Sequence, residues 1–174
     1  GFDAKRAFHN ASGLGNYSRF LIRILAEHFP EHNYLLFNPK ENNRWNIAAH
    51  SSVQEINPTK KTIGSLWRSF YGNKKVDQHN LQVYHGLSNE LPFGIGKSKA
   101  KKVVTIHDVI FKRYPQFYNS ADRLIYDKKY KHALSAADTI VAISETTKED
   151  IVAFYNVSPD KIKVVYQGCE PLFY

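Results

Sequence analysis

The chain has 174 residues, of which 43% are hydrophobic, and it carries a formal net charge of +8. This length predicts one domain with a sizeable core, and no apolar run approaches the roughly 18 residues needed to span a membrane. The single cysteine, Cys169, excludes an internal disulfide framework and favours a reducing compartment. The positive charge suits an anionic partner or is only a solvated surface. Without an arginine-rich arm or a nucleic-acid motif, we expect no nucleic acid as partner.

The chain opens with a strand, a glycine-bearing loop and a helix. Residues 1–8 read as the end of a strand, and the chain contains no methionine, so we expect a fragment whose first strand is truncated. A polar loop follows over residues 9–16. The next segment has apolar residues at spacings of three and four, which predicts a helix that ends at Pro30.

The loop before this helix carries a weak signal for phosphate binding. Glycines let the backbone come close to a ligand, and free N–H groups at a helix start attract phosphate. The alternative is a tight turn that requires glycine for steric reasons. The segment is neither a dinucleotide fingerprint nor a P-loop. Its candidate residues are Gly13, Leu14, Gly15 and Asn16.

Strands and helices alternate along the rest of the chain. Strands are predicted over residues 33–38, 52–56, 81–85, 103–106, 138–143 and 162–166. Helices are predicted over residues 62–71, from a cap at Ser120, and from a capping-box spacing at residues 146–149. This alternation predicts an α/β fold with a mostly parallel, doubly wound, Rossmann-like sheet over residues 1–174.

Polar residues follow several of these strands. His107 and Asp108 end the β-branched run of residues 103–106, and His85 ends an earlier strand. Ligands of open α/β sheets bind beyond the carboxyl ends of the strands, so these groups are expected to share one rim with the glycine loop and with residues 144–145. The alternative for residues 107–108 is that they only begin a loop, with Asp108 capping the next turn.

Other constellations are less informative. His28 and His32 have the spacing of a helical metal pair, but Pro30 lies between them, and no cysteine pair supports zinc. There is no nucleophile-elbow motif, and Cys169 is interpreted as structural. Residues 109–118 are predicted to form an aromatic-rich loop that stacks on a sugar, contacts a membrane interface or packs in the core.

Four stretches of the chain together resemble one family. They are residues 12–19, residues 105–108 with Tyr114-Pro115, residues 136–145 and residues 164–170. In this order they resemble the N-terminal domain of the GT-B-fold retaining glycosyltransferases of family 4, which include many bacterial mannosyl- and glucosyltransferases of polysaccharide synthesis. The sequence departs from the family where Leu14 separates Gly13 from Gly15, and where Cys169-Glu170 replaces the commoner valine–aspartate.

The resemblance implies transfer of a hexose from a nucleotide-diphospho sugar to a glycan or lipid-linked acceptor, with retention of configuration. The donor would bind mainly to a C-terminal domain that is absent here, so this acceptor-side half is expected to be inactive alone. No metal or other cofactor is expected. The alternative is a stand-alone sugar- or nucleotide-binding module without catalysis.

The resemblance also implies roles for individual residues. His107 and Asp108 would be catalytic, with proton handling, sugar orientation and loop anchoring all open for His107. The donor phosphates would meet the residues Gly13, Leu14, Gly15 and Asn16. The acceptor would meet the residues His85, Asn89, Ser144 and Glu145. The chain is expected to be cytoplasmic, with peripheral contact to the inner membrane face as a hypothesis.

Overall fold

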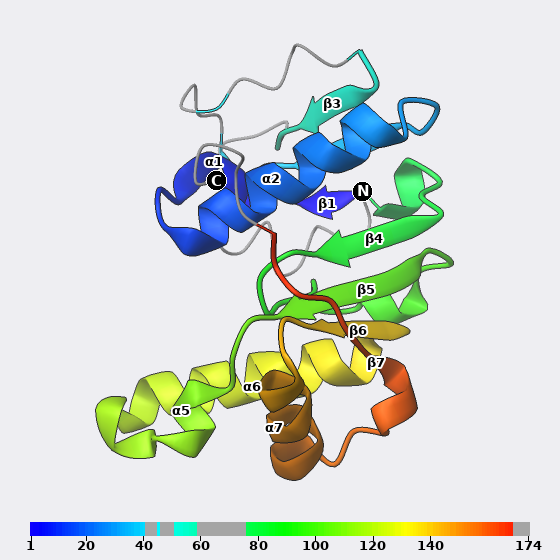
Figure 1. The fold of residues 1–174 in the computed structure, drawn as a ribbon. Coiled ribbons are helices and arrows are strands. Elements are labelled where there is room, and N and C mark those ends of the chain that lie inside the picture. Colours follow the sequence, from blue (N-terminus) through cyan, green and yellow to red (C-terminus); the bar gives the residue numbers. More distant parts are fainter. Residues whose placement is uncertain (41–44, 46–50, 59–75, 169–174) are drawn as a thin grey trace.

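The computed structural model describes residues 1–40, 45, 51–58 and 76–168 (Figure 1). Seven strands form one sheet in the order β3-β2-β1-β4-β5-β6-β7, and every neighbouring pair is parallel. The strands are β1 (Phe2–Asp3), β2 (Tyr34–Phe37), β3 (Val53–Ile56), β4 (Val83–Gly86), β5 (Lys101–Ile106), β6 (Thr139–Ala142) and β7 (Ile162–Val164). The predicted α/β fold with a doubly wound parallel sheet is confirmed.

Helices and short 3₁₀ turns connect the strands. The helices are α1 (Lys5–His9), α2 (Gly13–His28), α5 (Ile110–Arg113), α6 (Ser120–Ala136) and α7 (Glu145–Tyr155). The 3₁₀ turns are η2 (Ile95–Lys97), η3 (Pro115–Phe117) and η4 (Pro159–Lys161). No helix among the described residues is long and apolar enough to cross a membrane.

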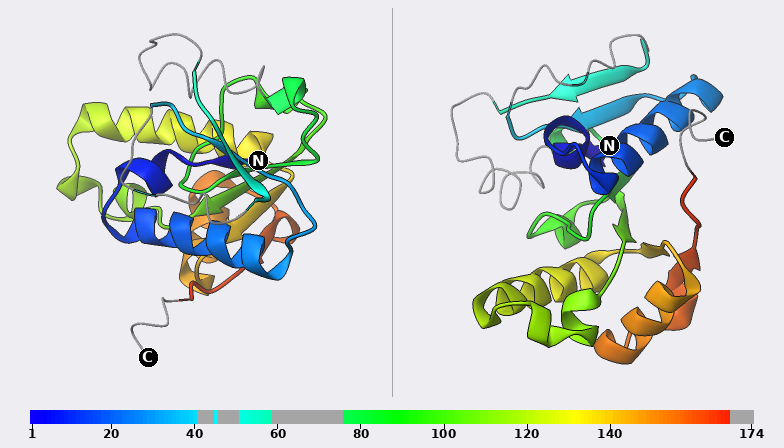
Figure 2. Two further views of the ribbon diagram at one scale, coloured as in Figure 1. Left: turned by 90° about the horizontal axis from the view of Figure 1, so that it is seen from above. Right: turned by 60° about the vertical axis from the view of Figure 1, so that its left-hand side comes forward.

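The sheet lies between helices on both of its faces. Seen from above, α2 and α6 lie on opposite sides of the strands (Figure 2). The buried side chains form two clusters accordingly. One contains residues of α2 and of the strands beside it: Phe2, Ile22, Ala26 and Leu36. The other contains residues of α6, β5 and β6: Val104, Ile106, Ala133, Leu134 and Ile140.

The direction in which the chain adds strands reverses between β1 and β4. The chain passes from β1 to β2 and β3 on one side, and then returns to place β4 on the other side of β1. There Phe2 pairs with His85, and Asp3 pairs with Gly86. Connections leave such a switch point in opposite directions and open a crevice at the carboxyl ends of the strands. The topology therefore places the expected binding edge beyond β1, β4 and β5.

The N-terminal segment differs from its prediction. Only Phe2–Asp3 forms a strand, and α1 follows it directly. The Asn10 side chain accepts hydrogen bonds from the N–H groups of Ser12, at 2.8 Å, and Gly15, at 3.3 Å. These bonds begin a new helix at Gly13, so the predicted glycine loop is the first turn of α2. The hydrogen bonds of the Asn10 side chain, and not the strand propensity of the preceding residues, therefore determine where α2 begins.

Other boundaries also shift. The predicted aromatic loop contains α5 and η3. Asn119 caps α6 in place of Ser120, because its side chain accepts the N–H of Asp122 at 2.8 Å. Ser144 caps α7, which therefore begins before the predicted capping box. The helix predicted over residues 62–71 and the structural interpretation of Cys169 lie outside the described residues.

Candidate functional site

His107 lies at the centre of the carboxyl edge of the sheet, directly after β5, and is only 8% exposed. Its Nε2 atom lies 2.9 Å from the Leu87 carbonyl oxygen, so this nitrogen carries the proton and donates it. Its Nδ1 atom then accepts a hydrogen bond from the Gln167 amide at 3.0 Å. The ring of Tyr17 stands edge-on to the imidazole, with the ring centroids 4.8 Å apart. The imidazole is thus fixed in one tautomer and one orientation.

The surroundings keep His107 neutral. Burial lowers the pKa of this histidine because it disfavours the charged imidazolium. The hydrogen bond to Leu87 and the carboxylate of Asp108 oppose this effect, whereas the positive charge of Arg6 adds to it. A neutral imidazole with a defined tautomer is able to accept a proton or to orient a hydroxyl group.

The backbone of His107 is held as firmly as its ring. Its N–H donates to the side chain of Asn89 at 2.9 Å, and its carbonyl accepts from the Thr147 hydroxyl at 3.2 Å. Asn89 adopts a left-handed conformation, with φ of 61°, and its own N–H donates to the Thr105 carbonyl at 2.9 Å. Asn89, expected to contact the acceptor, therefore ties the loop after β4 to the end of β5.

His85 faces inward from β4, on the side of the sheet covered by α2. Its Nε2 lies 2.8 Å from the Thr105 hydroxyl, and the same hydroxyl lies 3.0 Å from that of Tyr17. Its ring also lies 5.9 Å from that of Phe2. Burial lowers the pKa of His85 to about 3, so this histidine is neutral at physiological pH. The structure places His85 one layer beneath the edge that carries His107.

The first turn of α2 leaves two N–H groups without an internal partner. Gly15 and Asn16 donate to the Ser12 carbonyl at 2.9 and 3.0 Å, whereas Gly13 and Leu14 have no hydrogen-bond acceptor for their N–H groups among the described residues. A side chain at position 15 would place its Cβ 1.9 Å from the Asn10 carbonyl oxygen, but nothing lies within 4 Å at position 13. Gly15 is therefore required by packing, while Gly13 and Leu14 present N–H groups at a helix start.

Asp108 and the start of α7 complete the edge. The Asp108 carboxylate accepts from the N–H of Ile110 at 3.2 Å, which is the turn-capping role considered as the alternative. Ser144 accepts from the Thr147 N–H at 3.1 Å and caps α7, and Glu145 is exposed in the first turn of that helix. Since Thr147 also bonds to the His107 carbonyl, the start of α7 lies against the histidine.

Three residues at this edge were not predicted from the sequence. Tyr17 was assigned to the apolar stripe of its helix, and Gln167 to an exit segment 60 residues from His107. Arg6 was assigned to a strand. The structure places it on α1, with its Nε buried and without a hydrogen-bond partner, and its charge lowers the pKa of His107. The sequence shows the charge of Arg6. It does not show the contacts of Tyr17 and Gln167 with His107, because these depend on the fold.

Metal ligands do not gather at the edge. In the described part of the chain, no group of three or more histidine, cysteine, aspartate or glutamate side chains is arranged to hold a metal ion.

Comparison with known proteins gives the family of this chain. The profile of Glycosyltransferase Family 4 matches residues 11–171, so the chain belongs to this glycosyltransferase family. The chain is 23% identical, over 172 residues, to O-antigen chain mannosyltransferase B of Escherichia coli, covering 91% of this chain and 44% of that protein. A crystal structure of a glycosyltransferase from Rickettsia africae ESF-5 is similar with a TM-score of 0.45 and 16% identity, covering 89% of this chain and 38% of that one. The chain therefore spans less than half the length of either protein.

Proposed function

We propose that this chain is the acceptor-side half of a retaining GT-B glycosyltransferase, which moves a hexose from a nucleotide-diphospho sugar to a glycan or lipid-linked acceptor. The observation that carries the proposal is the fixed, neutral His107 at the switch-point edge of a chain that belongs to Glycosyltransferase Family 4. A second domain after this one would supply most of the donor contacts, and the described chain alone would not turn over.

In this proposal the donor diphosphate lies at the start of α2. The unpaired N–H groups of Gly13 and Leu14 support it, because helix starts favour phosphate and stabilise the negative charge of a leaving group. Arg6 supports it as well, since its Nε is buried without a hydrogen-bond partner, and such a group is costly unless an acceptor such as an anion pairs with it. Gly15 would contribute indirectly, because its missing side chain lets the turn pack against Asn10. The Asn16 side chain accepts a hydrogen bond from Arg19 at 2.5 Å.

His107 would orient the transferred sugar or the attacking hydroxyl. Its Nε2 is committed to a backbone carbonyl, so Nδ1 is the atom that would meet the substrate once Gln167 moves away. Gln167 lies on an exposed segment beyond β7, which supports such an exchange. Configuration would be kept by attack on the same face, with the leaving phosphate taking the acceptor proton, a route that needs no metal.

The acceptor would approach from the side of Asp108 and Glu145. Asp108 follows His107 directly on the turn before α5, and Glu145 is an exposed residue in the first turn of α7, whose Thr147 bonds to the His107 carbonyl. Asn89 and Ser144 would support the acceptor indirectly, because one holds the His107 N–H and the other caps α7. The protein would work in the cytoplasm, at the inner membrane face when its acceptor is lipid-linked.

The test uses a chain extended through the proposed second domain, incubated with a panel of UDP-, GDP- and ADP-sugars. We expect one donor to release its nucleoside diphosphate, and we expect the 174-residue chain to release none. Turnover by the 174-residue chain would contradict the proposal that a second domain supplies most of the donor contacts. Binding of a sugar or nucleotide by the extended chain, without release in the presence of any acceptor tested, would instead identify a binding module.

A further inference from the structure

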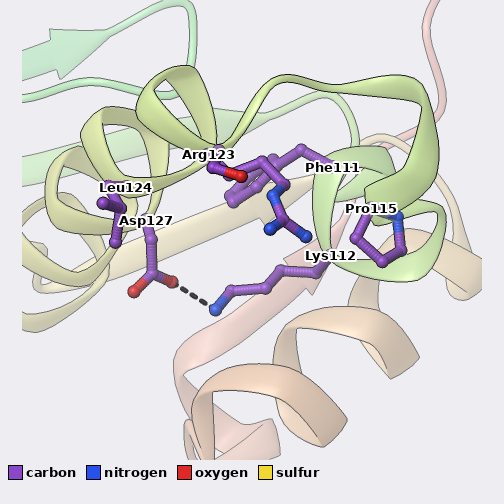
Figure 3. A pocket seen from close by; sticks show the side chains of 7 residues that line it. Phe111, Lys112, Pro115, Arg123, Leu124 and Asp127 are labelled. Carbon is purple, nitrogen blue, oxygen red and sulfur yellow. Dashed lines mark ion pairs between the residues drawn. The ribbon is translucent and has the colours of Figure 1, made fainter.

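A cavity of about 410 Å³ lies between α5, η3 and the first turns of α6, outside the edge described above (Figure 3). Its lining combines apolar and charged side chains: Phe111, Lys112, Pro115, Ser120, Arg123, Leu124 and Asp127. A cavity of this size suits a small organic ligand, and a few charged groups in an apolar lining define its orientation.

The charges of the cavity are unbalanced. Lys112 and Lys131 share one carboxylate, that of Asp127, at 2.5 and 2.8 Å. Arg123 has no ion-pair partner among the described residues, and its Nε is buried without a hydrogen bond. Figure 3 shows the Arg123 guanidinium pointing toward the Lys112 side chain, across the space between α6 and α5. Two cations thus line the cavity with a single anion, which Lys131 also engages from outside, and the buried Nε of Arg123 is left to be satisfied by an anionic group of a ligand.

Large apolar side chains surround the cavity and face solvent. Leu124, which lines it, is 72% exposed, and Phe117, two residues after the lining Pro115, is 76% exposed. The rings of Tyr114 and Phe117 lie 6.3 Å apart. Exposed apolar side chains clustered beside a charged cavity indicate a ligand that is apolar at one end and anionic at the other.

The cavity adjoins the proposed transfer edge. Helix α5 begins two residues after Asp108, whose carboxylate accepts the Ile110 N–H. The Tyr130 hydroxyl, from the middle of α6, donates to the Asp108 carbonyl at 3.1 Å. The same two helices therefore build the cavity and hold Asp108. A ligand seated at Arg123 would therefore lie on the helices that hold Asp108.

We propose that this cavity binds the phosphate of an amphiphilic acceptor, a phosphate ester whose alkyl chain lies along Leu124 and Phe117. The naming of this ligand as an acceptor rests on the proposed function, whereas its binding does not. A guanidinium forms two parallel hydrogen bonds with a phosphate, so Arg123 would contribute more than a lysine at the same place.

The test is calorimetric titration of the chain with three probes: octyl phosphate, inorganic phosphate and octyl glucoside. We expect octyl phosphate to bind, Arg123→Gln to weaken it about tenfold or more, and Lys128→Gln on the same helix but outside the cavity to leave it unchanged. Leu124→Ser changes a mostly exposed side chain and should weaken octyl phosphate but not inorganic phosphate.

Three results would overturn the proposal. Equal affinity for inorganic and octyl phosphate would identify a free-phosphate site. Equal affinity for octyl glucoside and octyl phosphate would show that the negative charge of the phosphate does not contribute to binding. Absence of binding by monomeric octyl phosphate would remove the site, and sedimentation with anionic vesicles, added as a fourth probe, would then show whether this face binds a membrane surface instead. Because the titration uses no sugar donor, its failure is separate from a failure of donor turnover.

Discussion

At the scale of single residues, the edge depends on contacts that reach His107 from four other parts of the chain: α2, the loop after β4, the start of α7 and the segment after β7. Tyr17, Leu87, Asn89 and Gln167 each fix a different atom or face of this histidine. Under the proposed function such a histidine is anchored by the fold and still available to substrate at Nδ1, because only the bond to Gln167 comes from an exposed segment. Loop anchoring is therefore compatible with either of the other two roles left open by the sequence, proton handling and sugar orientation.

The two glycines at the start of α2 should respond differently to the same substitution. Gly15→Ala is expected to lower the free energy of unfolding by about 1–3 kcal/mol, because its Cβ would lie 1.9 Å from a backbone oxygen that must move. Gly13→Ala meets no atom within 4 Å and should leave stability nearly unchanged. Urea unfolding of both variants checks this. Equal losses in the free energy of unfolding would show that the turn at Asn10 moves to accommodate the new side chain without cost.

His85 should make stability depend on pH. Its pKa is about 3 in the folded chain, whereas that of an unfolded histidine is about 6.5, so the unfolded state binds the extra proton first as the pH falls. Stability is then lost below about pH 6.5, at ~1.4 kcal/mol per pH unit for this one proton. His85→Gln, measured by urea unfolding between pH 7 and 5, should remove that part of the slope.

Tyr17→Phe serves as the control for this measurement. It removes a hydroxyl from the same hydrogen-bonded group at Thr105 without removing a group that titrates in this range. It should lower stability by about 0.5–1.5 kcal/mol at every pH and leave the slope as it is. If His85→Gln also changed the free energy of unfolding equally at every pH, His85 would take up its proton in the folded chain as readily as in the unfolded chain.

At the scale of elements, the sequence predicted the strands more closely than the helix starts. The β-branched and apolar runs all became strands, since burial between two helical layers requires such residues. Short-range hydrogen bonds decided the helix starts, at Asn10, Asn119 and Ser144. The four-residue α5 had no periodic pattern by which it could be predicted.

The cap of α6 gives a direct test of one such boundary. Asn119→Ala removes the side chain that accepts the Asp122 N–H and should cost about 1 kcal/mol. Ser120→Ala changes the neighbouring, exposed residue that the sequence suggested as the cap, and should cost close to nothing. Thermal or urea unfolding compares the two, and a larger loss at Ser120 would reverse the assignment.

At the scale of the whole molecule, the strand order explains why the candidate residues meet. The reversal between β1 and β4 brings the ends of β1, β4 and β5 to one edge, with α1, α2 and α7 around it. The sequence predicted that polar strand ends would share a rim. It did not predict Arg6, Tyr17 or Gln167, since their roles depend on which distant segment packs against the edge.

The central claim is that sugar transfer takes place at the edge around His107. The measurement that tests it most directly is the initial rate of nucleoside diphosphate release by the extended chain, with its preferred donor, in His107→Ala and His132→Ala. His132 also bonds through its ring to a backbone carbonyl, that of Pro92 at 2.9 Å, but it lies on α6 away from the edge. We predict a loss of about 100-fold or more for His107→Ala with the fold intact, and a rate near that of the unchanged chain for His132→Ala. Equal rates in the two variants would contradict the account.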